Sequence, residues 1–145
     1  MPIRILLADD CPAIHRGITL LLDSADFEVV AAAHDGNEAV RLALACRPDV
    51  AILDQSMPGL TGISAARAIR AQLPEVHLIL LTASVTEHEV ALALAAGIRA
   101  CVLKNDATDD LVRAIHDVVR GAAFLSASIA RLMFESYLPK AGTAS

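Results

Sequence analysis

Aromatic residues are scarce in this sequence: Phe, Trp and Tyr make up 3% of its 145 residues, and Trp does not occur. The interior must therefore be filled mainly by aliphatic side chains, since residues of the set AVILMFWYC still reach 55%. That composition suits parallel strands covered by helices on both faces. A chain of this length corresponds to one ordinary domain.

The sequence also lacks an excess of positive charge. There are 12 Lys and Arg residues against 17 Asp and Glu residues, which gives a formal net charge of -5 at pH 7. Nucleic-acid binding needs clustered basic side chains, so we expect that this chain alone does not bind DNA. Apolar runs of membrane-spanning length and a signal-peptide layout are missing too, which predicts a cytoplasmic protein without a membrane partner.

Cysteine is infrequent and follows no motif. The three cysteines are Cys11, Cys46 and Cys101, and their spacing matches neither a metal site nor a redox pair. We expect reduced thiols, as in a cytosolic protein.

Short apolar runs alternate with helical patterns five times along the chain. The runs are nearly continuous, as is typical of strands buried on both faces, and cover residues 3–8, 27–33, 50–53, 77–82 and 100–103. Capping boxes are predicted at Asp35–Glu38 and Thr86–Glu89. Five strand–helix units with right-handed crossovers favour a doubly wound α/β fold, with a five-stranded parallel sheet in the order 2-1-3-4-5.

The pattern changes after the fifth unit. We expect one domain over residues 1–123, a C-terminal linker helix within 124–138 capped by Ser126, and a flexible tail over 139–145. The helix carries apolar residues at positions 129, 132, 133 and 137, more than a free terminal helix needs. This stripe calls for a partner surface: a further domain, a second copy of the chain, or the flank of the domain itself.

Polar side chains stand where the predicted strands end. Asp9 and Asp10 follow the first strand, and the third, fourth and fifth strands lead into Asp54, Thr82 and Lys104. Ligands of open parallel sheets bind beyond the carboxyl ends of the strands, where the strand order reverses. Taken singly, each residue fits a turn, a cap or a surface position, but the joint pattern predicts one site.

Three carboxylates in a small space raise one another's pKa unless cations compensate them. A lysine and Mg²⁺ would do so, because Mg²⁺ prefers oxygen ligands. A carboxylate is also a competent nucleophile toward phosphoryl groups. No histidine or further acid stands at these strand ends to drive fast hydrolysis, so a persistent covalent state is expected.

These residues resemble the receiver domains of two-component response regulators, with a flavodoxin-like receiver fold. The resemblance covers residues 3 to 121 and is carried by IRILLADD (3–10), DVAILDQSMPGLTG (49–62), LLTA (80–83) and VLK (102–104). It implies a phosphorylation-activated switch in which Asp54 is the phospho-acceptor and a sensor histidine kinase is the donor. The implied switch is not an enzyme, apart from catalysing its own aspartyl phosphorylation and dephosphorylation. Small phosphodonors are an alternative source of the phosphoryl group.

The resemblance also assigns roles around Asp54. Asp10, Asp9 and Asp54 would hold Mg²⁺, Asp10 directly and Asp9 mainly through water, and the backbone carbonyl of Ser56 would complete the protein ligands. Lys104 would contact the phosphoryl oxygens. Thr82 would move to hydrogen-bond the phosphoryl group and start the conformational change.

Residues 97 to 132 resemble the subfamily with a LuxR/FixJ-type helix-turn-helix output, in which the lysine is often not followed by proline, as in Lys104-Asn105. The implied role is transcription regulation, with a possible homodimer and with DNA bound only through an output domain absent from this chain. Cys101 stands where the family usually has Tyr or Phe. We expect it to weaken communication between the phosphoryl site and the face formed by the fourth helix and the fifth strand.

Four alternatives compete with this interpretation. A haloacid-dehalogenase-type phosphatase would place its nucleophile on the first strand, whereas Asp54 is on the third. A flavodoxin-like cofactor domain would need a hydroxyl- and glycine-rich loop after the first strand, which residues 9–12 lack. A phosphorylation-independent interaction module on the same fold and a stand-alone single-domain regulator stay open.

Overall fold

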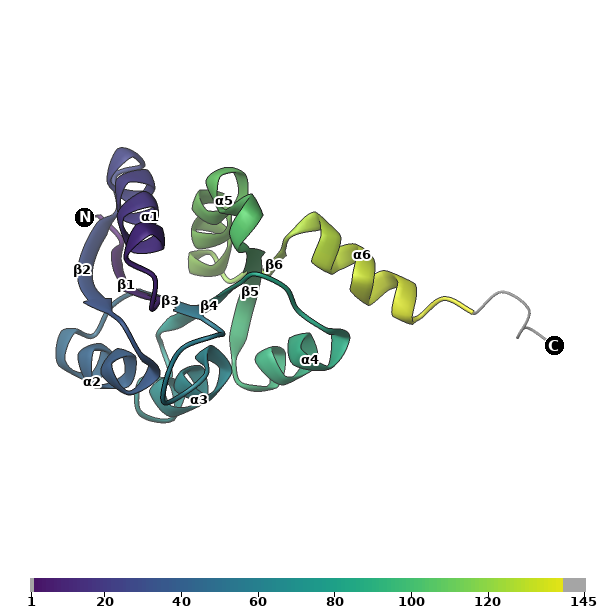
Figure 1. The fold of residues 1–145 in the computed structure, drawn as a ribbon, viewed down its shortest axis with the longest axis horizontal. Coiled ribbons are helices and arrows are strands. Elements are labelled where there is room, and N and C mark those ends of the chain that lie inside the picture. The colour runs from purple at the N-terminus through teal and green to yellow at the C-terminus, as the bar shows by residue number, and fades with distance from the viewer. Residues whose placement is uncertain (1, 140–145) are drawn as a thin grey trace.

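The computed structural model describes residues 2–139, which form one parallel sheet with helices on both faces (Figure 1). The strand order is β2-β1-β3-β4-β5-β6, and every neighbouring pair is parallel. The bounds are β1 (Arg4–Ala8), β2 (Glu28–Ala33), β3 (Val50–Asp54), β4 (His77–Thr82), β5 (Ile98–Leu103) and β6 (Phe124–Leu125).

The parallel α/β sheet is confirmed, but the prediction of five strands is wrong. β6 adds a sixth strand at the β5 edge, where Ala100 pairs with Phe124 and Cys101 with Leu125. Two residues are too few to produce a recognisable strand pattern in the sequence.

The helices form two layers. One face of the sheet carries α1 (Pro12–Ser24) and α5 (Ala107–Val119). The other face carries α2 (Gly36–Cys46), α3 (Gly62–Gln72) and α4 (Glu87–Ala95) (Figure 1). A short 3₁₀ helix, η1 (Lys104–Asp106), joins β5 to α5, and α6 (Ala127–Ser136) follows β6.

Alternate residues of one strand enter opposite halves of the core. On β1, Leu6 and Ala8 belong to the core under α2, α3 and α4, whereas Ile5 and Leu7 belong to the core under α1 and α5. All four side chains are fully buried. Burial on both faces explains why the strands are continuous apolar runs rather than alternating ones.

The capping predictions are confirmed at one helix and corrected at the other. Thr86 and Glu89 form the reciprocal capping box of α4. Asp35 accepts a hydrogen bond from the Glu38 backbone N–H, but Oε1 of Glu38 accepts from the backbone N–H of His34 instead of returning to Asp35. The cap of α2 is therefore one residue wider than a capping box.

The last helix lies outside the layered body (Figure 1). It ends at Ser136, two residues before the predicted end, and Ser126 makes no side-chain cap bond to it. Ile129 is buried and Met133 packs against the same core, whereas Phe134 and Tyr137 are 67% and 81% exposed. Apart from its first residue, the predicted tail lies outside the described residues. No helix among residues 2–139 is long and apolar enough to span a membrane.

Candidate functional site

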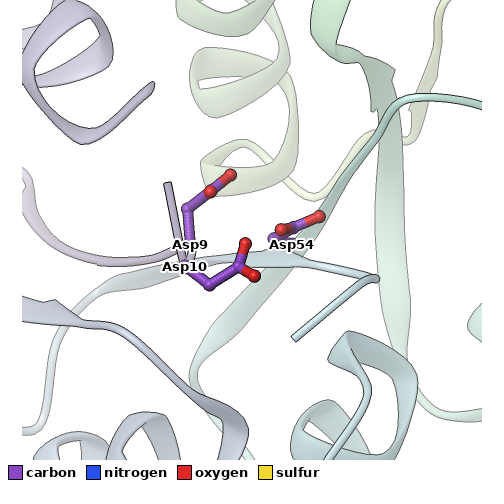
Figure 2. Close-up of side chains that lie close together, drawn as sticks. All are labelled: Asp9, Asp10 and Asp54. Carbon is purple, nitrogen blue, oxygen red and sulfur yellow. The ribbon is translucent and has the colours of Figure 1, made fainter. Parts of the chain in front are cut away.

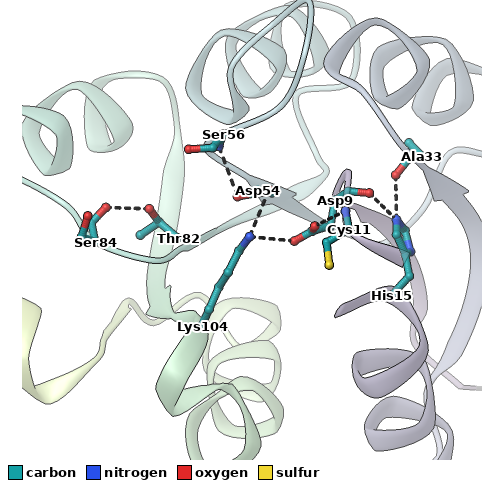
Figure 3. Close-up of polar contacts among 9 residues, drawn as sticks. All are labelled: Asp9, Cys11, His15, Ala33, Asp54, Ser56, Thr82, Ser84 and Lys104. Carbon is teal, nitrogen blue, oxygen red and sulfur yellow. Dashed lines mark hydrogen bonds and ion pairs between the residues drawn. The ribbon is translucent and has the colours of Figure 1, made fainter. Parts of the chain in front are cut away.

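The sheet brings the five strand-end residues to one edge. Asp9 and Asp10 follow β1. Asp54 and Thr82 are the last residues of β3 and β4, and Lys104 follows β5. Figure 3 shows the Lys104 ammonium between the carboxylates of Asp9 and Asp54. Parallel strands end on the same side of a sheet, so the order of the strands alone brings these side chains together.

The three aspartates form an acidic cluster (Figure 2). One carboxylate oxygen from each of Asp9, Asp10 and Asp54 lies within 4.8 Å of the other two. Asp9 and Asp54 are buried, with 0% and 1% of their surface exposed, whereas Asp10 is exposed. The cluster thus has two buried carboxylates and one that reaches the surface.

Lys104 is the cation that bridges the two buried carboxylates of the cluster. Its Nζ lies 3.1 Å from Oδ2 of Asp9 and 3.1 Å from Oδ2 of Asp54. Burial alone would lower the pKa of Lys104, but the hydrogen bonds and negative charges of the two aspartates outweigh burial and raise the pKa. Lys104 is therefore held in its charged form.

The effects that shift the pKa of Asp54 balance differently. Burial raises the pKa of the Asp54 carboxyl above 3.8, and the charge of Asp9 raises it further. The Ser56 backbone N–H, 3.2 Å from Oδ1, and Lys104 act in the opposite direction without cancelling the rise. A carboxylate destabilised in this way gains from an added cation.

The cluster fits a divalent cation. Three carboxylates and one ammonium leave two negative charges uncompensated, and hard oxygen donors are what Mg²⁺ binds. Besides Lys104, the buried Oδ2 atoms of Asp9 and Asp54 have no donor among the described residues. Buried carboxylate oxygens of this kind need a further partner.

Thr82 and Ser56 take positions that the sequence did not specify. The Thr82 hydroxyl donates to the carbonyl oxygen of Ser84, 2.7 Å away in the loop before α4, so it is engaged outside the acidic cluster (Figure 3). Ser56 faces Asp54 with its backbone N–H.

His15 was missed by sequence reasoning. It lies on α1 and is buried, with Nε2 2.7 Å from the carbonyl oxygen of Asp9 and 2.8 Å from that of Ala33. Two carbonyl acceptors require that Nε2 carries the hydrogen. His15 therefore fixes the backbone behind Asp9 and does not touch the carboxylates. The available signal was its place on the buried stripe of α1, three residues before Ile18.

The loop after Asp54 depends on two further residues that the sequence did not single out. A Cβ at Gly62 would lie 2.5 Å from the carbonyl oxygen of Asp54, so only glycine lets α3 begin this close to the strand end. Oε1 of Gln55 accepts a hydrogen bond from the backbone N–H of Ile63 over 2.9 Å. These contacts fix the backbone that presents Asp54.

Comparison with known proteins yields one family. Residues 5–116 match the model of the response regulator receiver domain. The nitrate/nitrite response regulator protein homolog of Haemophilus influenzae is 36% identical over 134 residues, which cover 92% of this chain and 64% of that protein. NarL of Escherichia coli is 31% identical, over 93% of this chain and 63% of its own length. The chain thus spans less than two thirds of these relatives.

Solved structures agree with the sequence matches. A LuxR-family two-component response regulator from Aurantimonas sp. SI85-9A1 superposes with a TM-score of 0.88 at 31% identity, covering 94% of this chain and 98% of that one. The isolated receiver domain of RcsB from Salmonella enterica gives a TM-score of 0.84 at 28% identity, covering 92% and 99%. From these matches and the site geometry, the chain belongs to the family of response regulator receiver domains, of the LuxR type.

Proposed function

We propose that this chain is a phosphorylation-activated switch whose phospho-acceptor is Asp54. The observation that carries the proposal is the place of the Asp54 carboxylate: it is buried at the end of β3, beside an acidic pair and 3.1 Å from the Lys104 ammonium. A carboxylate oxygen of Asp54 attacks phosphorus, the bond from phosphorus to the donor breaks, and the donor leaves with the bonding electrons. The product is an acyl phosphate.

The neighbouring residues serve this transfer by position and charge. Asp10, Asp9, Asp54 and the backbone carbonyl of Ser56 would hold Mg²⁺, with Asp9 acting through water. When bound, Mg²⁺ neutralises the charge on the transferred phosphoryl oxygens. Lys104 contacts one of these oxygens, and the Thr82 hydroxyl leaves Ser84 to donate to another.

The partners follow from the same reaction. A sensor histidine kinase is the phosphoryl donor, and the switched state acts in transcription regulation through a homodimer, an output domain or another protein. DNA is bound only through an output domain outside this chain. This last point is supported by the net charge of -5 and by the 63–64% of the relatives' length that the chain spans.

Intact-mass measurement after incubation with acetyl phosphate and Mg²⁺ tests the proposal. We expect the wild type to gain one phosphoryl group, Asp54→Asn to gain none, and the exposed control Asp23→Asn to behave as the wild type. A phosphoryl group on the Asp54→Asn protein would overturn the assignment of the acceptor. A wild type that gains no mass would favour the phosphorylation-independent interaction module.

A further inference from the structure

Ser126 joins three elements through its hydroxyl. It is fully buried at the point where β6 gives way to α6. Its Oγ accepts a hydrogen bond from the backbone N–H of Leu103 over 3.0 Å and donates to Oδ2 of Asp110 over 3.2 Å. One side chain therefore ties the end of β5 and the first turn of α5 to the start of α6.

The hydroxyl replaces a backbone carbonyl in the β5–β6 ladder. The Ser126 backbone N–H donates to the carbonyl of Cys101, so in a regular parallel ladder the Ser126 carbonyl would next accept from Leu103. That carbonyl instead accepts from the N–H of Ala130 and opens α6. The hydroxyl thus lets the chain turn from strand to helix while the half-buried N–H of Leu103 keeps a hydrogen-bond partner.

The backbone at Leu103, which the Ser126 hydroxyl holds, leads directly into the functional site. Leu103 pairs with Thr82 on its β4 side and precedes Lys104, whose ammonium lies between Asp9 and Asp54. The direction in which Lys104 leaves the sheet is set by the backbone at Leu103. β5 has only the two-residue β6 beyond it, so Ser126 is the contact that secures this end of the strand on that side.

We propose that Ser126 is a positioning residue for phosphoryl transfer: it holds the Leu103–Lys104 backbone so that the Lys104 ammonium is directed at Asp54. The proposal rests on the proposed function of Asp54. A displacement of a lysine by about 1 Å is enough to weaken a transfer that depends on positioning. Ser126 also connects α6, which begins one residue later, directly to the phosphoryl site.

The first measurement is amide hydrogen exchange at Leu103 without metal. Ser126→Ala removes the acceptor and is expected to speed the exchange of Leu103 by about tenfold, the effect of losing one hydrogen bond of ordinary strength. Ser126→Thr keeps a hydroxyl and should restore the protection. Ser136→Ala is the matched control, because Ser136 is exposed on α6 and donates only to the carbonyl of Met133.

The second measurement separates positioning from a merely structural role. The rate of phosphorylation by acetyl phosphate with saturating Mg²⁺ is compared for Ser126 and Ser126→Ala, first with Lys104 present and then in a Lys104→Ala background. We expect a loss of about threefold to tenfold with Lys104 and almost none without it, because residues that act as one unit are not additive. Ser126→Thr should recover the rate.

Each outcome decides the question. Equal losses in both backgrounds, or no loss with Lys104 present, overturn the positioning role and leave the function of Asp54 untouched. A wild type that acquires no phosphoryl group overturns the proposed function and this role with it. If Ser126→Ala does not fold, Ser126→Cys takes its place, since the thiol is a weaker acceptor of similar size.

Discussion

The hydroxyl of Thr82 donates a 2.7 Å hydrogen bond to the carbonyl oxygen of Ser84. A hydroxyl has a single hydrogen, so it cannot serve Ser84 and a phosphoryl group on Asp54 at the same time. Any new bond from Thr82 to the phosphoryl group releases Ser84. The loop between β4 and α4 then loses the hydrogen bond that Thr82 gives it.

The first prediction is that Thr82→Val disconnects this loop from the phosphoryl site. Beryllofluoride with Mg²⁺ should shift the amide resonances of residues 83–87 in the wild type, and by less than about half as much in Thr82→Val, because valine has no hydroxyl hydrogen to donate. Thr108→Val, an exposed threonine of α5, is the control. Equal shifts in wild type and Thr82→Val would contradict the prediction.

The second prediction concerns the two neighbouring acids. Oδ1 of Asp9 already accepts from the N–H of Cys11 over 2.8 Å and its Oδ2 pairs with Lys104, whereas Asp10 is exposed and has no hydrogen bond or ion pair within residues 2–139. Asp10 therefore has the carboxylate that is free to bind Mg²⁺ directly.

In magnesium titrations followed by calorimetry, Asp10→Asn should weaken binding by about tenfold or more, and Asp9→Asn by less. Asp23→Asn should bind as the wild type does. A larger loss in Asp9→Asn than in Asp10→Asn would reverse the assignment.

The third prediction is that Asp54→Asn stabilises the metal-free protein at pH 7. Burial raises the pKa of Asp54 above 3.8, so the folded chain holds this proton more tightly than the unfolded chain does. Stability linked to this group is complete below pH 3.8 and is lost as the pH rises through the raised pKa. Asparagine removes that loss, and Lys104 keeps Asp9 as its partner.

Thermal unfolding checks this. Tm should be higher for Asp54→Asn than for the wild type at pH 7, by roughly 2 to 4 °C for each kcal/mol gained. The difference should shrink as the pH is lowered toward 3.8. A variant that melts below the wild type at pH 7 would show that the ion pair with Lys104 outweighs the cost of burial.

The sequence was enough to predict the first five strands and the convergence of their polar ends, because both follow from long apolar runs and from the parallel order. It could not predict β6 or the bonds that the Ser126 hydroxyl makes in place of a cap. The capping rule assigns a serine before a helix to the helix itself, whereas Ser126 bonds to Leu103 and Asp110, two partners 23 and 16 residues away. Contacts of this range depend on the assembled fold.

The fourth prediction concerns the thiols. Burial raises the pKa of Cys101 to about 11, whereas Cys11 and Cys46 are partly exposed. At pH 8 only about one Cys101 in a thousand is ionised, and the thiolate is the reactive form. Iodoacetamide followed by peptide mass analysis should therefore modify Cys11 and Cys46 well before Cys101. Alkylation of all three at similar rates in the folded protein would contradict the buried position of Cys101.

The fifth prediction separates the two sides of α6. Ile129 is 2% exposed in the core that includes Val90 and Ala93 of α4, whereas Phe134 is 67% exposed. The flank of the domain therefore covers Ile129 of the predicted apolar stripe, whereas the ring of Phe134, which is not on that stripe, stays outside the core. Burial, and not apolar character, should decide what each residue contributes to folding.

Urea denaturation of the two alanine variants measures this. Ile129→Ala should lower the free energy of unfolding by about 2–4 kcal/mol, because it removes buried methyl groups and leaves a cavity. Phe134→Ala should change it by less than about 0.5 kcal/mol, as surface substitutions do. Since α6 begins next to Ser126, Ile129→Ala should weaken the packing of α6 and so also speed amide exchange at Leu103. Phe134→Ala should leave this exchange unchanged. A small loss for Ile129→Ala would mean that α6 leaves the domain in solution.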